Sequence, residues 1–221
     1  MKLTTRIILP VASLVLTICA IGCAPAGGMG GLMGGGGAMG GMPDADRMMK
    51  KQELSQKLMS DPQVPAWYTQ REKLTMALGD KIFDKEFDRV FDSLTIALAS
   101  LEANVNNMER TSGYITTGLP RLNPARTDQL KKAMLVDYCK HNGYDPKLLE
   151  KQGPYDMDVD MFAGMSMKQQ AMTISLVKQS PTQTKVKIRF ANVNYPPEMQ
   201  EYYKVVWPAI DKQIFLDRAV D

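Results

Sequence analysis

The chain has 221 residues, of which 44% are hydrophobic, 23% charged and 7% aromatic. This ordinary globular composition excludes collagen-like, wholly disordered and polytopic membrane proteins. The chain has 27 Lys and Arg residues against 24 Asp and Glu, and Lys2 and Arg6 are the only charged residues before Asp44. Without those two, 25 basic groups face 24 acidic ones, a balance that argues against nucleic-acid binding, which depends on clustered cations.

The first 22 residues have the order of an export signal. Met1–Arg6 is short and positively charged, and a 15-residue apolar run, Ile7–Ile21, follows it. A membrane-spanning helix needs about 20 apolar residues, so this run is too short for a permanent anchor. We therefore expect residues 1–22 to be a cleaved signal peptide.

Gly22-Cys23 at the end of this segment resembles the lipobox of bacterial lipoproteins, although Ala20 stands where that family usually has Leu. The resemblance implies that Cys23 is diacylated, becomes the first residue of the mature chain and anchors it to a membrane. Each buried methylene of an acyl chain contributes about 0.8 kcal/mol to such anchoring. In that family an Asp after the cysteine retains the protein in the inner membrane. Here Ala24 follows, which implies the periplasmic face of the outer membrane of a Gram-negative cell.

Residues 24–43 contain no charged residue and ten of the chain's 17 glycines. Burial in such a segment cannot offset the entropy of ordering its backbone, so we expect a disordered tether with a reach of about 25 Å. A short helix is expected over Asp44–Met59. The predicted domains are a signal peptide (1–22), the lipidated cysteine with its tether (23–66) and a periplasmic α+β domain (67–221).

Four methionines in the tether suggest an alternative function: Met29, Met33, Met39 and Met42. Thioethers are soft ligands for Cu(I), so a periplasmic Cu(I)-handling protein is the alternative to a lipoprotein without a metal. No His or Cys accompanies these methionines, and a low-complexity linker is the plainer interpretation.

The first half of the domain has three predicted parts. Lys73–Phe83 is predicted to be a strand, because its apolar residues alternate. A helix of about 18 residues is predicted to start after Asp84, since apolar residues recur there at steps of three and four. Val105–Glu109 and Tyr114–Thr117 are predicted to be two short strands joined by a turn at Gly113.

The second half begins with a predicted helix, Pro124–His141, with Asn123 as its N-cap. Asp145-Pro146 starts a short helical turn, and Tyr155–Met161 alternates as an edge strand would.

The remaining segments predict a hairpin and a long helix. Met172–Gln179 and Lys185–Ala191 alternate and are predicted to pair. The final helix, Pro197–Leu216, is expected to be kinked or divided at Pro208. These elements predict an α+β fold, in which two long helices pack on one face of an antiparallel sheet and a small helical insertion is added.

The helix segment Arg89–Leu98, followed by the turn Glu109–Ile115, resembles a pattern of small envelope lipoproteins, among them the helix-grip C-subunit lipoprotein of the β-barrel assembly machinery. The likeness covers about residues 72–117, and more loosely 170–217. It implies a binding or scaffolding module without catalytic residues to transfer.

Candidate catalytic and metal sites are few. The only histidine, His141, follows Cys139 by two residues, and on a helix these side chains point about 200° apart, so they are not expected to pair. The run Asp156-x-Asp158-x-Asp160 resembles the start of a calcium loop but lacks its glycine and glutamate. The sequence therefore predicts no enzyme, no cofactor and no bound metal.

Two groups of side chains are candidates for partner binding. The first is a basic stripe expected on one face of the hairpin, suited to lipid phosphates or an acidic partner, although alternation also produces a plain solvated face. It comprises Lys178, Lys185, Lys187 and Arg189. The second is aromatic, with core packing as the alternative to a docking surface. It comprises Trp67, Tyr68, Tyr202, Tyr203 and Trp207.

The function predicted from these features is that of a membrane-anchored envelope lipoprotein. We expect a non-catalytic binding or scaffolding module in the periplasm, acting in outer-membrane assembly or maintenance. Its expected partners are the membrane, reached through the lipid anchor, and an envelope protein or lipid.

Overall fold

The computed structural model describes residues 45–152, 158–159 and 169–218, all within the compact unit Gly41–Asp221. The predicted signal peptide, lipidated cysteine and Gly/Met-rich segment lie outside this range. No helix in the described part is both long and apolar enough to cross a bilayer. The elements in chain order are α1 (Ala45–Ser60), α2 (Pro65–Leu78), β1 (Asp80–Phe83), α3 (Phe87–Ser100), β2 (Val105–Glu109), β3 (Tyr114–Thr117), α4 (Pro124–His141), the 3-10 turn η1 (Pro146–Leu149), β4 (Ala171–Ser180), β5 (Gln183–Ala191) and α6 (Pro196–Arg218).

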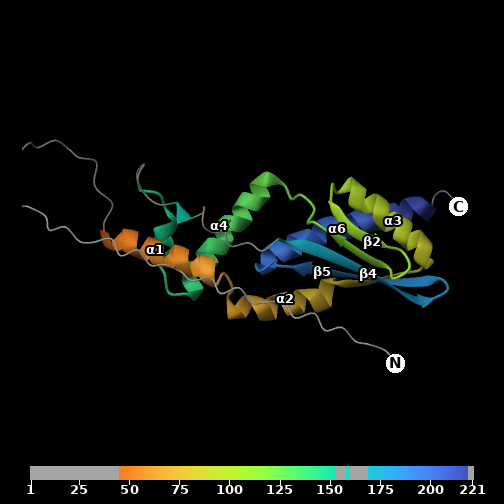
Figure 1. Cartoon of the computed structure of the whole chain (residues 1–221), viewed down its shortest axis with the longest axis horizontal. Coiled ribbons are helices and arrows are strands. Elements are labelled where there is room, and N and C mark those ends of the chain that lie inside the picture. Colours follow the sequence, from red (N-terminus) through yellow and green to blue (C-terminus); the bar gives the residue numbers. More distant parts are fainter. Residues whose placement is uncertain (1–44, 153–157, 160–168, 219–221) are drawn as a thin grey trace, which may run out of the picture. The chain divides into compact units, whose positions relative to one another are not determined.

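The five described strands form one antiparallel sheet in the order β1-β5-β4-β3-β2 (Figure 1). The hairpin of β4 and β5 occupies its centre, and β1 and β2 are the edges. Side chains of successive strand residues alternate between the two faces, and Met172, Ile174 and Leu176 of β4 are all buried on one of them. The predicted hairpin is confirmed, with a tighter turn than expected because the strands extend to Ser180 and Gln183.

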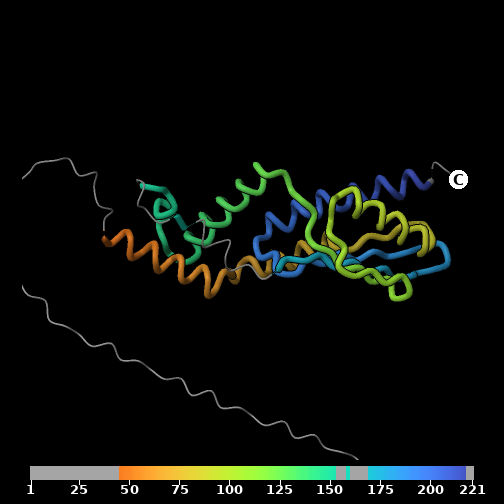
Figure 2. Tube along the Cα trace, turned by 45° about the horizontal axis from the view of Figure 1, so that its top comes forward, coloured from red at the N-terminus to blue at the C-terminus, as the bar shows by residue number. Residues whose placement is uncertain are grey.

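Helices α3 and α6 cover the buried face of the sheet, side by side in Figures 1 and 2. Their apolar faces join the sheet in one core, which we call the sheet core. The α+β prediction with two long helices on one face is confirmed. The fully buried centre of the sheet core is Val90, Leu94, Ala97, Leu98, Ile115, Met172, Ile174, Val186, Ile188, Val206 and Ile210.

A second core lies among α1, the start of α2, α4 and η1, and we call it the helical core. The short helix predicted over Asp44–Met59 is confirmed as α1. Its assignment to a tether that ends at residue 66 is wrong, because Leu54, Leu58 and Val64 are almost fully buried. Their partners include Trp67 and Leu135. The boundary error has a simple cause: α1 is mostly polar, and its few apolar residues are too sparse to indicate burial without the partner helices.

The predicted strand Lys73–Phe83 is wrong over its first half, since α2 extends to Leu78 and only β1 is extended. Pro65 occupies the first turn of α2, where its missing N–H costs nothing. Leu74 and Leu78 are four residues apart and pack together against the sheet core, whereas Met76 between them is 83% exposed. A helix therefore buries both leucines and leaves Met76 exposed, whereas the predicted strand would place all three side chains on one face.

The other predictions are mostly confirmed. The boundaries of β2, β3 and α4 are as predicted, and the Asn123 side chain caps α4 by accepting from the Ala125 N–H. Helix α3 has 14 residues and begins after Glu86, so it is shorter than expected. Helix α6 is a single helix with Pro208 inside it, so of the two alternatives, a kink or a division at Pro208, the division is wrong. The strand predicted over residues 155–161 lies outside the described residues except for positions 158 and 159.

Candidate functional site

The predicted basic stripe does not form as one face. Lys185, Lys187 and Arg189 alternate along β5 on the face turned away from the helices. Lys178 pairs in register with Thr184, which is fully buried on the helix-covered face. Directly paired residues share a face, so Lys178 lies on the helix-covered face, opposite to Lys185, Lys187 and Arg189. The stripe therefore has three residues, not four.

Two of those three residues hold the edge strand β1 in place. Asp80 forms salt bridges with Lys185 (2.8 Å) and Arg189 (2.7 Å), and Arg189 also donates to the Gly79 carbonyl. Burial alone would raise the pKa of Asp80, but the hydrogen bonds from Lys185 and Arg189 outweigh it and lower that pKa. One carboxylate of the domain thus pairs with two of the three cations of the stripe.

The predicted aromatic surface is mostly core. Trp67, Tyr202 and Tyr203 are buried, and Trp207 is partly buried and donates its indole N–H to the Leu78 carbonyl (2.6 Å). Tyr68 alone of the five is exposed. Core packing, the alternative interpretation, is the correct one for the buried members.

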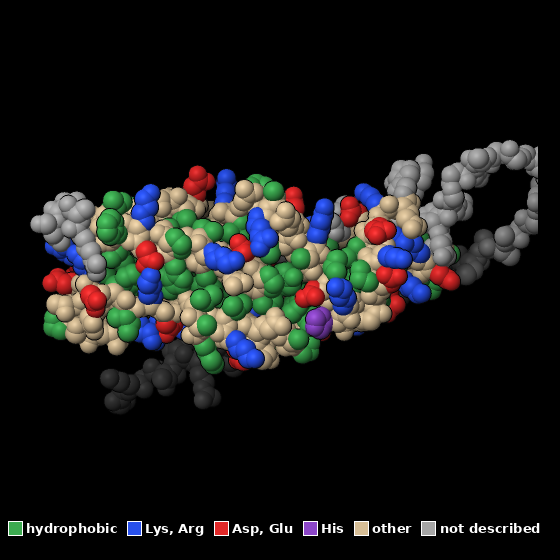
Figure 3. Space-filling view, turned by 180° about the vertical axis from the view of Figure 1, so that it is seen from behind, with side chains coloured by type: hydrophobic (Ala, Val, Ile, Leu, Met, Phe, Trp, Pro, Cys, Tyr) green, Lys and Arg blue, Asp and Glu red, His purple; other side chains and the backbone are tan. Residues whose placement is uncertain are grey.

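Cys139 and His141 do not form a nucleophile–base pair. Cys139 is a free thiol with no exposed surface, and burial raises its pKa to about 11. His141 lies on the surface, where its Nδ1 atom is 2.9 Å from the Asp137 carbonyl (Figure 3). A thiol that is both buried and protonated is a poor nucleophile.

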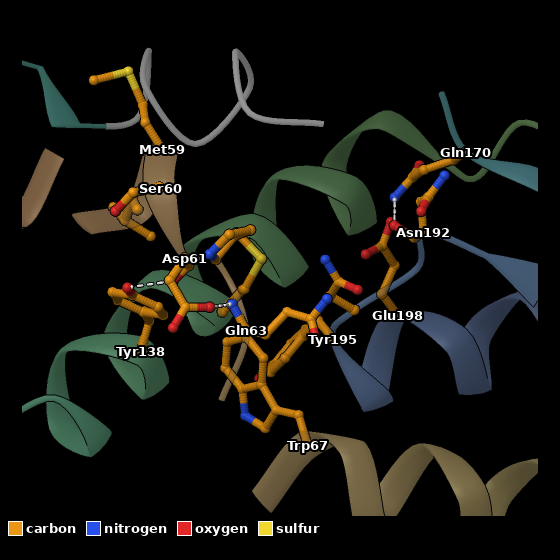
Figure 4. A pocket seen from close by; sticks show the side chains of 14 residues that line it. Met59, Ser60, Asp61, Gln63, Trp67, Tyr138, Gln170, Asn192, Tyr195 and Glu198 are labelled. Atoms are coloured by element: carbon orange, nitrogen blue, oxygen red, sulfur yellow. Dashed lines mark hydrogen bonds between the residues drawn. The ribbon is translucent and has the colours of Figure 1, made fainter. Parts of the chain in front are cut away.

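The described chain has a pocket of about 320 Å³ at one end of α1 (Figure 4). Its walls come from the end of α1, the connection to α2, the middle of α4, the residues before β4 and the connection from β5 into α6. The chain leaves α1 before Pro62 and enters α2 at Pro65, and both prolines disfavour helix in the residue before them. This short link places Asp61 and Gln63 on one wall.

The aromatic side of the pocket is formed by Trp67, Tyr138 and Tyr195. The rings of Trp67 and Tyr195 meet edge to face with centroids 5.2 Å apart, and those of Trp67 and Tyr138 lie 6.3 Å apart. The Tyr138 hydroxyl donates to the Asp61 carbonyl (2.7 Å), and burial raises the pKa of Tyr138 to about 12. These contacts make the aromatic side a neutral, well-packed surface.

Two carboxylates line the pocket, Asp61 and Glu198. The Gln63 N–H donates to Asp61 Oδ1 (3.4 Å). Glu198 lies in the first turn of α6 and accepts from the Tyr202 hydroxyl (3.4 Å) and from the Gln170 side chain. Burial raises the pKa of Glu198 above its usual value, and the two hydrogen bonds only partly offset this.

Side-chain amides complete the lining. Gln170 and Asn192 tie the entrance to β4 to the exit of β5, because the Gln170 amide donates to the Asn192 carbonyl (3.4 Å) and the Asn192 amide donates to the Gln169 carbonyl (2.8 Å). Asn194 accepts from Arg71 (2.8 Å). Neutral amides beside carboxylates and aromatic rings are suited to recognising a polar small molecule.

Within residues 45–152, 158–159 and 169–218, no three His, Cys, Asp or Glu side chains are grouped as a metal site. The calcium-like run has two of its three aspartates outside this range, and the tether methionines considered for Cu(I) lie outside it as well.

Sequence reasoning missed most of the pocket. It singled out Trp67 but not Asp61, Gln170 or Glu198, which are far apart in the chain and belong to no local motif. The sequence does contain one signal for the pocket. Asp61-Pro62 and Pro196-Pro197 each mark a turn of the chain beside a carboxylate, Asp61 in the first case and Glu198 in the second.

No protein-family model matches the sequence, and no curated protein matches it with significant similarity.

Proposed function

We propose that this protein is a lipid-anchored envelope lipoprotein whose α+β domain is a non-catalytic binding module at the periplasmic face of the outer membrane. The observation that carries the proposal is the order of the N-terminus: positive residues, an apolar run too short to stay as an anchor, and then Gly22-Cys23. Acylation of Cys23 would hold the domain at the membrane without insertion of any helix.

The pocket supports the binding part of the proposal. Its volume of about 320 Å³ is at the small end of the range for small-molecule sites. Its lining combines aromatic rings, amides and carboxylates, which recognise ligands through contact and hydrogen bonds. The one thiol of the described chain is buried and protonated, which argues against a nucleophilic role for it.

Metabolic labelling with radioactive palmitate tests the anchor. The natural chain should incorporate label, Cys23→Ser should lose it, and Cys19→Ser should keep it, since Ile18 before Cys19 is too bulky for the cleavage site. Intact-mass measurement of the natural product should show a chain that starts at Cys23 with acyl chains attached. Label retained by Cys23→Ser, or a product that keeps its first 22 residues, would refute the proposal.

The role in outer-membrane assembly or maintenance is also a proposal, supported by the resemblance of residues 72–117 to envelope lipoproteins. Crosslinking in cells from a photoreactive residue at Lys187, on the open face of the sheet, tests it. Capture of an outer-membrane protein or lipid is expected, and capture of inner-membrane components alone would contradict it.

A further inference from the structure

We propose that the pocket between α1, α4 and the start of α6 binds a small linear organic diamine, with one ammonium group at Glu198 and the other at Asp61. This inference rests on the proposed binding function and names the class of ligand. Three features of the pocket favour such a ligand: its negative charge, the position of its two carboxylates, and the lack of a cation for either of them among the described residues.

The charge of the lining has one sign. Asp61 and Glu198 are the charged side chains that line the pocket, and every other lining side chain is an amide, an alcohol, an aromatic ring or an apolar group. Glu198 is partly buried and Asp61 is exposed, and two carboxylates that line one concave site concentrate negative potential there. Such a site attracts cations and repels phosphates and other anions.

Neither carboxylate forms an ion pair with any described residue. The contrast within α6 is direct: Glu201, one turn after Glu198, pairs with Arg126 and with Lys204, each at 2.9 Å. Among the residues that the structure describes, Glu198 accepts from the neutral Tyr202 and Gln170.

The nearby Arg71 does not serve as that cation, because its guanidinium donates to Asn194 Oδ1 (2.8 Å) and to the Val193 carbonyl (3.3 Å). A partly buried carboxylate without a cation is costly in the empty domain, and a ligand ammonium removes that cost.

The two carboxylates lie on opposite sides of the pocket, with Trp67 and Tyr195 between them (Figure 4). This arrangement suits a ligand with a charge at each end and methylenes in the middle. The methylenes would pack on the aromatic side, and an ammonium close to a ring gains about 0.5–2 kcal/mol from cation–π attraction. A monoamine would satisfy only one carboxylate, and a neutral diol would satisfy neither charge.

Calorimetric titration of the mature lipoprotein in a neutral detergent tests the inference with three matched probes: putrescine, n-butylamine and 1,4-butanediol. Putrescine should bind with one molecule per chain, butylamine about two- to fivefold more weakly because it leaves the exposed Asp61 unpaired, and butanediol without measurable heat because it leaves the partly buried Glu198 unpaired. No putrescine binding at millimolar concentration, or equal binding of putrescine and butanediol, would overturn the inference.

Isosteric substitutions assign the binding to these residues. Glu198→Gln should weaken putrescine binding at least about tenfold and Asp61→Asn by about two- to fivefold, because each removes one charge and keeps the side-chain shape, and Asp61 is exposed whereas Glu198 is partly buried. The matched control is Glu201→Gln, which makes the same change on the same helix outside the pocket and should alter affinity less than about twofold. If both pocket variants bind as the natural chain does, the site is wrong; thermal unfolding of each variant checks that it is folded.

A second readout uses the fluorescence of the pocket tryptophan. The chain has two tryptophans, so Trp207→Phe leaves Trp67 as the sole reporter. Its emission should change and saturate at the same putrescine concentration as the calorimetric signal. An unchanged emission during binding would show that putrescine binds outside this pocket.

The two proposals can fail separately. Palmitate labelling without diamine binding would support the lipoprotein proposal and reject a diamine as the ligand. Diamine binding to a chain that is not acylated would do the reverse.

Discussion

Glu198 is a partly buried carboxylate with neutral hydrogen-bond partners, and its environment favours the protonated form. The titratable groups around it are Tyr202 on its own helix, and Asp61, Tyr138 and Tyr195 across the pocket. A folded-state pKa above the unfolded value means that ionised Glu198 destabilises the empty domain. Binding residues often have such a cost, because they are placed for a ligand and not for the fold.

We therefore predict that Glu198→Gln stabilises the ligand-free protein at pH 7.5, by on the order of 1 kcal/mol. The gain should shrink as pH falls through the raised pKa of Glu198 and vanish below its ordinary value, where the carboxyl is neutral in both states. Urea unfolding of both chains between pH 4 and pH 8 measures the difference. A destabilised variant at pH 7.5 would show that Glu198 has a structural role instead.

At the scale of elements, α1 and α2 show how a helix is defined by its partners. The α1 sequence is polar with few apolar residues, yet Leu54 is fully buried against the helical core. Lys51, also buried, donates to the Glu150 carbonyl at the end of η1 (3.0 Å). In α2 the alternation of apolar residues favoured a strand, and the packing of Leu74 and Leu78 decided for a helix.

The burial of α1 gives a testable stability difference. Leu54→Ala should lower the free energy of unfolding by about 3 kcal/mol, because it removes a fully buried side chain and leaves a cavity. Gln52→Ala, an exposed position on the same helix, should change it by less than about 0.5 kcal/mol. Denaturant unfolding measures both. Equal stability of the two variants would indicate that α1 does not pack on the helical core and belongs to the tether, as predicted from the sequence.

At the scale of the domain, two cores share one chain. The sheet core combines α3, α6 and the five strands, while the helical core joins α1, α4 and η1. Helix α2 connects them, since Trp67 at its start belongs to the helical core and Leu78 at its end packs on the sheet core. The pocket lies where the helical core meets the start of α6. On the face shown in Figure 3, acidic and basic side chains are interspersed.

We predict that the helical core opens more readily than the sheet core, because it is smaller and lacks a long-range hydrogen-bonded ladder. Hydrogen exchange followed by mass spectrometry should show slower exchange in β4, β5 and α6 than in α1 and α4. A diamine should slow exchange in α1 and α4, since it bridges both sides of the pocket. Equal protection of the two cores without ligand would indicate a single cooperative unit.

Local patterns in the sequence predicted much of the fold. The cap at Asn123, the helical turn that starts at Asp145-Pro146, the apolar stripe of α3 and the alternation in β4 and β5 each depend on neighbouring residues, so they could be predicted without coordinates. The sequence by itself also determined the N-terminal order on which the lipoprotein proposal rests.

Tertiary structure alone decided four matters. It turned residues 73–78 into helix, buried α1, and brought Asp61, Gln170 and Glu198 together in one pocket. It also placed Lys178 on the other side of the sheet from its expected companions. The physical reason is the same in each case: burial and charge pairing depend on residues distant in the chain, and no local period or motif encodes which distant residue will be the partner.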